Sequence, residues 1–257
     1  MKKLLLLLFS ILISFNSFAE TGCSEKDYKE DILKSTIYFQ ERGGLFYLPN
    51  QSEPYSGENL CVHKEASGQY YLKGTIKNGK KHGKETYWRK NGQIESERNY
   101  KNGLLDGEYT YLWLNGQITV SNFKDDKKHG KLTKWHANGQ KSLEGNYKNG
   151  KEDGKSTMWY ENGQIKYEFN WRDGEVYHED GKSTSWHENG QIKSETIYKD
   201  NKINGKETNW YKNGQIKSER NYKDSKLNGK WTKWHENGQI KSESNWKDGE
   251  CISGDCD

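Results

Sequence analysis

The chain has 257 residues, of which 30% are hydrophobic and 30% are charged, with a net charge of +4. Ordinary globular domains contain about 45–50% apolar residues, so a large conventional core is excluded. The charges of both signs are interspersed, which excludes the basic block expected of a protein that binds nucleic acid. The aromatic content of 13%, with 10 Trp and 17 Tyr, argues against disorder. We therefore expect a thin structure held together by aromatic rings.

The chain begins with the features of a secretory signal peptide. A basic start precedes the apolar stretch Leu4–Phe15, and small residues precede a cut after Ala19. A lipoprotein signal using Cys23 is the alternative, although Glu20 lies where such a site needs an aliphatic residue. No later segment approaches the ~20 apolar residues of a transmembrane helix. The sequence predicts a signal peptide over 1–19 and an exported protein, whether periplasmic, cell-surface or secreted.

Residues 20–57 are predicted to form an N-terminal lead or cap. The run Asp31–Lys34 is compatible with a short helix within 24–43. An uncovered edge strand invites aggregation, so such a helix would cover the first edge of a sheet. The sequence leaves open whether this helix forms.

A repeat of about 24 residues occupies residues 58–250. Eight copies carry a Gly-Gln pair, and its glycines are Gly68, Gly92, Gly116, Gly139, Gly163, Gly190, Gly214 and Gly238. A second glycine lies nine residues before each of the last seven, and Thr follows it three residues later. Two residues further on, six copies have Trp, at Trp88, Trp135, Trp159, Trp186, Trp210 and Trp234. The exception has Leu112, with Trp113 beside it.

Each copy is predicted to be a β-hairpin. The Asn-Gly before Gln indicates a type I′ turn, because both central residues of that turn need positive φ. Thr and Trp are two residues apart and therefore share one face of a strand. A second turn, Asn-Gly-x-x-x-Gly, returns the chain to the next hairpin. One copy is three residues longer between Gly174 and Gly181, where a surface loop tolerates insertion.

Hairpins this small are unstable alone and are expected to stack. The predicted fold class is all-β: an elongated antiparallel β-meander of about eight tandem hairpins, forming a single-layer twisted sheet. Strands lie ~4.8 Å apart, so the array is on the order of 75 Å long. Trp rings of successive copies are expected to lie near one another.

The repeat resembles a known family. The unit Gly-Lys-x-Thr-x-Trp-Tyr/His-Glu-Asn-Gly-Gln-Ile-Lys-Ser-Glu is similar to the bacterial MORN-repeat variant, a relative of the membrane-occupation-and-recognition-nexus repeat. The lead-in over 44–57 resembles the opening of proteins grouped as the YwqK-type toxin–antitoxin-associated family. The resemblance covers about residues 44–250. It implies a repeat protein, and the antitoxin label of that family fits poorly with export.

No catalytic or metal site is predicted, and no cofactor. His136, His187 and His235 share one repeat position, but consecutive ones would be ~19 Å apart, too far to share an ion. We interpret them as residues of a solvated strand face. The glutamates of the Ser-Glu step are expected to pair with nearby lysines, and they are Glu97, Glu144, Glu168, Glu195, Glu219 and Glu243.

Four cysteines lie at the two ends of the predicted array. Local pairing, Cys23–Cys61 and Cys251–Cys256, is favoured because a disulfide needs Cα atoms within about 7 Å. Both bonds would hold the ends of the array, with residues 251–257 as a C-terminal cap.

The function predicted from these features is an exported, non-catalytic scaffold that binds an unidentified protein partner through the Trp-bearing face. Sequence does not decide whether those rings are an open binding face or only the thin core. A cell-wall or glycan-binding module that uses the aromatic face is the alternative. A membrane-surface role ranks third, because anionic membranes attract clustered Lys and Arg.

Overall fold

The computed structural model describes residues 22–24, 37–62 and 70–256. The predicted signal peptide and the run Asp31–Lys34 lie outside these residues. The described part of the chain contains 25 strands, of which 23 join one sheet and two, β3 and β4, form a separate pair. Among the described residues, no helix is long and apolar enough to span a bilayer.

The strands of the N-terminal half are β1 (Gly22–Cys23), β2 (Ile37–Tyr38), β3 (Gln40–Arg42), β4 (Leu45–Tyr47), β5 (Gly57–Val62), β6 (Tyr70–Lys77), β7 (Lys80–Lys81), β8 (Gly83–Trp88), β9 (Ile94–Lys101), β10 (Leu104–Leu112), β11 (Ile118–Lys124) and β12 (Lys127–Trp135). Those of the C-terminal half are β13 (Lys141–Lys148), β14 (Lys151–Glu152), β15 (Gly154–Trp159), β16 (Ile165–Arg172), β17 (Glu175–Tyr177), β18 (Gly181–Trp186), β19 (Ile192–Lys199), β20 (Lys202–Trp210), β21 (Ile216–Lys223), β22 (Lys226–Leu227), β23 (Gly229–Trp234), β24 (Ile240–Lys247) and β25 (Glu250–Gly254).

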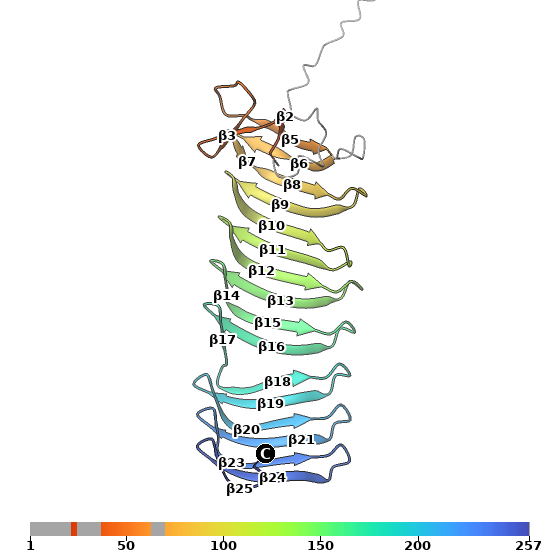
Figure 1. The fold of residues 1–257 in the computed structure, drawn as a ribbon, viewed down its shortest axis with the longest axis vertical. Helices are drawn as coiled ribbons and strands as arrows, with labels where there is room; N and C mark the ends of the chain where they lie inside the picture. Colours follow the sequence, from red (N-terminus) through yellow and green to blue (C-terminus); the bar gives the residue numbers. More distant parts are fainter. Residues whose placement is uncertain (1–21, 25–36, 63–69, 257) are drawn as a thin grey trace, which may run out of the picture.

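From β5 onward the hairpins are stacked in chain order along the long axis of the molecule (Figure 1). Each hairpin pairs antiparallel within itself, as β8 does with β9, and its second strand pairs antiparallel with the next hairpin, as β9 does with β10. The sheet is open and does not close into a barrel. The predicted all-β meander is confirmed.

The two turns of each repeat differ in conformation, also where both contain Asn-Gly. After β8, the Gly92 N–H donates to the Arg89 carbonyl, and within the Asn91-Gly92 pair only Gly92 has a positive φ, of 83°. This is a three-residue loop with a left-handed glycine, so the prediction of a type I′ turn at Asn-Gly-Gln is wrong. The Asn91 side chain instead accepts a hydrogen bond from the Gln93 N–H, at 3.1 Å.

The type I′ geometry occurs at the other turn of the repeat. Lys101 pairs with Leu104, and the two residues between them, Asn102 and Gly103, have φ values of 53° and 91°. A two-residue connection needs both central residues in the left-handed region, which Asn and Gly tolerate best.

The core is concentrated at the N-terminal end. Eight of the nine buried hydrophobic residues in the described chain lie between Cys23 and Tyr87, and the ninth is Leu132. Along the rest of the array the most buried side chains are small and polar, and include Ser156, Ser218 and Thr232. The buried positions of the array are thus occupied by small hydroxyl side chains. The stability of the array therefore depends more on backbone hydrogen bonds between strands than on apolar burial.

Among the residues that the structure describes, short strands cover the first edge of the sheet. β1 pairs in parallel with β2 and with β5. The sequence left open a helix within 24–43, and the described residues 37–43 of this segment form β2, β3 and a turn instead. The sulfur atoms of Cys23 and Cys61 lie at bonding distance there, with both residues fully buried. Cys251 and Cys256 pair at the other end, as predicted.

Candidate binding surfaces

The six predicted Trp residues occupy equivalent places along one side of the sheet. Each is the last residue of the first strand of its hairpin, and each is half-buried. Across the hairpin each pairs with the residue that follows Gln, as Trp186 does with Ile192. These partners are Ile94, Lys141, Ile165, Ile192, Ile216 and Ile240. We call the six Trp residues and the five Ile partners the Trp–Ile stripe.

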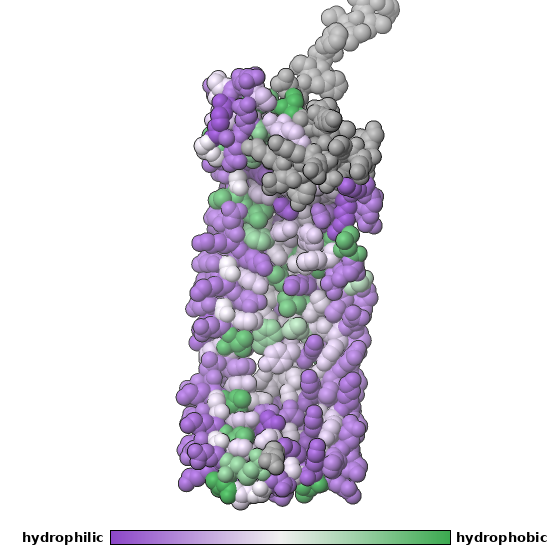
Figure 2. Space-filling view, in the orientation of Figure 1, coloured by the Kyte–Doolittle hydropathy of each residue, from purple (hydrophilic) through white to green (hydrophobic). Residues whose placement is uncertain are grey.

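Four of the five Ile members of the stripe are exposed to solvent, and Ile165 is half-buried. Ile94, Ile192, Ile216 and Ile240 are exposed, and Ile240 reaches 58%. The copy with Leu112 adds two more apolar side chains at its turn, Trp113 at 51% and Leu114 at 85% exposure. Figure 2 shows hydrophobic surface at the right margin, level with the β10–β11 turn. Sequence reasoning noted Trp113 only as an irregularity.

A ladder of ion pairs lies on the same face as the Trp residues. Lys and Glu pair across each hairpin, as Lys131 Nζ and Glu144 Oε2 do at 2.9 Å. The predicted pairing is present at every glutamate of the Ser-Glu step, and the lysine partners are Lys84, Lys131, Lys155, Lys182, Lys206 and Lys230. Hydrogen bonds from Lys141 and Lys131 hold the pKa of Glu144 below its usual value. The face is therefore nearly neutral along its length.

The histidines of the repeat join neighbouring hairpins. The Nε2 atoms of His136 and His187 donate to the carbonyl oxygens of Trp159 and Trp210 in the following copies, at 3.1 and 2.9 Å. Both histidines are half-buried, so our interpretation of a solvated face is wrong for them. His235 is exposed because no further copy follows it. In the described residues, no group of three or more His, Cys, Asp or Glu side chains could hold a metal ion.

The turn asparagines also connect copies. The side-chain amides of Asn138 and Asn162 donate to the backbone carbonyls of Glu161 and Glu188 in the next turn, each at 2.6 Å. Asn189 makes the equivalent bond further along. In these copies the turn Asn therefore bonds both within its own loop and to the neighbouring turn.

The ring contacts that we expected among the Trp residues occur instead on the opposite face. Tyr109 contacts Phe123 with ring centroids 5.9 Å apart, and Trp231 contacts Trp246 at 5.8 Å. Cations lie over these rings, as Arg98 does over Tyr87 at 4.2 Å. The face opposite the Trp–Ile stripe is thus the one stabilised by aromatic contacts.

Tyr147 on this opposite face predicts a specific loss of stability in alkali. Burial, and the hydrogen bond that its hydroxyl donates to Glu152 at 3.0 Å, raise its pKa to about 12. The unfolded chain would ionise Tyr147 near its ordinary value of 10.0, so its contribution is complete below that pH and is lost between about pH 10 and 12. The stability difference between the wild type and Tyr147→Phe should narrow over this range in urea titrations. An unchanged difference would contradict the assignment.

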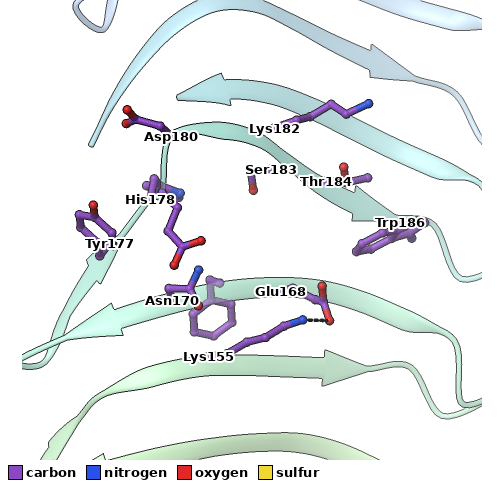
Figure 3. A pocket seen from close by; sticks show the side chains of 12 residues that line it. Lys155, Glu168, Asn170, Tyr177, His178, Asp180, Lys182, Ser183, Thr184 and Trp186 are labelled. Atoms are coloured by element: carbon purple, nitrogen blue, oxygen red, sulfur yellow. Dashed lines mark ion pairs between the residues drawn. The ribbon is translucent and has the colours of Figure 1, made fainter. Parts of the chain in front are cut away.

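The long repeat opens the sheet between β16 and β18. β17 extends the pairing with β16 to three residues, and β18 then pairs with β16 only at Tyr167 and Ser185. The equivalent joint of β13 with β15 has a second pair, Glu144 with Thr157. At the opening lies a cavity of about 440 Å³, which we call the seam pocket (Figure 3). Sequence reasoning located the insertion but read it only as a tolerated surface loop.

The comparisons with known proteins agree with this architecture. The family model for the MORN repeat variant matches six segments that together cover more than half of the chain, at residues 81–102, 128–149, 152–173, 175–200, 203–224 and 227–248. The copy between the first two segments is the one with Leu112 and Trp113. No curated protein matches the chain.

Proposed function

Because this chain belongs to the MORN repeat variant family, we propose that it is an exported, non-catalytic scaffold that binds a protein partner along the Trp–Ile stripe. Repeats of this family commonly bind proteins or membranes, and the family is a repeat scaffold rather than a known enzyme family. The two cysteine pairs support export, because disulfides persist mainly in oxidising compartments. An antitoxin role would be one form of this scaffold function.

The exposure of the Trp–Ile stripe is the observation that carries the proposal. Isolated apolar residues are normal on a surface, but here exposed Ile residues lie beside half-buried Trp residues in copy after copy. In the neighbouring ion pairs Lys and Glu neutralise each other, and these pairs form a polar margin. A protein interface has this composition, with aromatic and aliphatic anchors inside a polar rim.

Three substitutions at exposed positions test the stripe without disturbing the fold. In the variant Ile192→Lys/Ile216→Lys/Ile240→Lys, the charges buried at the interface should weaken binding of the partner at least tenfold, about 1.4 kcal/mol or more. Ile252→Lys is the matched control, because Ile252 is 62% exposed but lies in the C-terminal strand β25, outside the stripe. The measurement is quantitative affinity capture from the cell envelope of the source organism, with circular dichroism confirming an unchanged fold.

A defined partner retained by the wild type and by Ile252→Lys, but lost from the triple variant, would support the scaffold. Equal retention by all three proteins would exclude the stripe as its binding surface. Release of the bound material by free polysaccharide would instead assign the stripe to a glycan.

A further inference from the structure

We propose that the seam pocket binds a small, uncharged carbohydrate. The pocket borders the Trp–Ile stripe and shares Trp186 with it, and it arises from the three-residue insertion that distinguishes one repeat from the others. A volume of about 440 Å³ falls within the range of ~300–1,000 Å³ that is typical of small-molecule sites.

The opening contains an asparagine whose side-chain amide, like that of the exposed Asn146 one copy earlier, makes no hydrogen bond among the described residues. In three other copies the equivalent Asn amide donates to a backbone carbonyl of the next hairpin, as Asn99 does to Glu108 at 2.7 Å and Asn221 to Lys230 at 3.0 Å. At the seam the corresponding carbonyl belongs to Lys182, and the Asn170 amide makes no hydrogen bond to it or to any other described residue. Asn170 is half-buried and lines the seam pocket (Figure 3).

The other walls are held in place before any ligand arrives. The Asp180 carboxylate accepts a hydrogen bond from the Asp200 N–H at 2.7 Å. The His178 ring stacks on Tyr198 with centroids 3.8 Å apart and ring planes 8° from parallel, and its backbone N–H donates to Asn201 at 2.8 Å. These contacts fix the inserted segment against the following hairpin. A fixed wall loses little conformational entropy on binding.

The charges of the pocket disfavour an anionic ligand. The two lysines that line it are both neutralised, Lys155 by Glu168 and Lys182 by Glu195, each at 2.8 Å. An anion would therefore have to compete with existing ion pairs. Most of the remaining lining is polar, which disfavours a purely apolar ligand.

An uncharged sugar satisfies the groups that remain. Its hydroxyls can accept from the Asn170 amide and donate to the carboxylates of Glu179 and Asp180. Trp186 lies at the end of the opening and offers an aromatic ring for the C–H face of a sugar (Figure 3). A ligand with many hydroxyls and one apolar face matches this combination of an amide, carboxylates and a ring.

Two variants isolate the pocket. Asn170→Ala removes the free amide, and Asn146→Ala is its matched control, because Asn146 is the exposed residue at the same position one copy earlier. Deleting residues 176–178 changes the segment between Gly174 and Gly181 to Glu-Glu-Asp, closely like the Lys151-Glu152-Asp153 segment of the regular copy before it. This deletion should close the sheet and restore the pairing of Glu168 with Thr184.

The probes are maltose, cellobiose and N,N′-diacetylchitobiose at millimolar concentration, with glucuronate and putrescine as charged comparisons. Saturation-transfer NMR measures the binding. Saturable binding of at least one neutral disaccharide is expected for the wild type and for Asn146→Ala. Asn170→Ala should weaken it about tenfold, and the deletion should abolish it while circular dichroism shows an intact sheet. Binding of putrescine or glucuronate alone, no saturable binding of any neutral disaccharide, or equal affinity of the wild type and Asn170→Ala would overturn the proposal.

Discussion

Replacing Cys23 and Cys61 together by Ala is expected to destabilise the protein by about 4 kcal/mol, whereas the same change at Cys251 and Cys256 should cost about 2 kcal/mol. The first pair closes a sequence separation of 38 residues and the second only five, so the first removes more entropy from the unfolded chain. The first pair also lies in a buried cluster with Leu72.

Urea unfolding of the two double variants under oxidising conditions measures this difference. Because a repeat array need not unfold in one step, hydrogen exchange of the β5 and β6 amides should accompany it. Loss of protection confined to these strands is expected for the first variant. Equal losses of stability in the two variants would contradict this prediction, because the longer loop closed by Cys23 and Cys61 should cost more to release.

Removing the ammonium group of Lys81 is expected to cost roughly 3–5 kcal/mol. Its partner Glu85 is 2% exposed, and Lys81 Nζ lies 3.0 Å from its Oε2. Asn59 and Tyr87 donate further hydrogen bonds to the same carboxylate, at 2.8 and 2.9 Å. Lys81→Met leaves this carboxylate buried without a compensating cation, which is the costly case for an interior ion pair.

The Lys–Glu ladder supplies the control for this variant. Lys131 pairs with Glu144 at a similar distance, but their side chains are 53% and 30% exposed, so Lys131→Met should cost less than about 1 kcal/mol. Adding Glu85→Gln to Lys81→Met removes the buried charge and should recover part of the stability. Thermal and urea denaturation of the three variants measure these differences. Equal stability of Lys81→Met and Lys131→Met would contradict the prediction.

Sequence alone predicted the elements that depend on local pattern. The period of glycines gave the hairpins and the meander, and the positions of the cysteines at the two ends gave their pairing. The type I′ turn was assigned to the wrong loop of the repeat, because an Asn-Gly pair can occur in either loop. Asn91-Gly92 belongs to a three-residue loop and Asn102-Gly103 to a two-residue loop, and only the strand register distinguishes them.

The contacts on the two faces of the sheet could not be predicted, because they depend on how neighbouring hairpins are spaced. The sequence of a single repeat does not encode that spacing. His136 was interpreted as solvated because its partner, the Trp159 carbonyl, lies in the next copy. The segment 175–180 is three residues longer than its equivalent in the other copies, and this was visible in the sequence. Whether it bulges outward or opens the sheet depends on how far β17 continues to pair with β16. The Trp residues were singled out by their position in the repeat, but their exposed Ile partners became apparent only from the register across each hairpin.

The bonds between copies reach only the adjacent copy, and this has a consequence for how the protein can change over time. Asn138 and His136 each bond to residues 23 positions later, and none of these contacts extends to a third hairpin. Gain or loss of one whole regular unit would therefore leave every remaining joint with its partner. The length of the array can therefore change by duplication or deletion of whole repeats while both disulfide-closed ends are kept. Such a change requires no new contacts between the remaining hairpins.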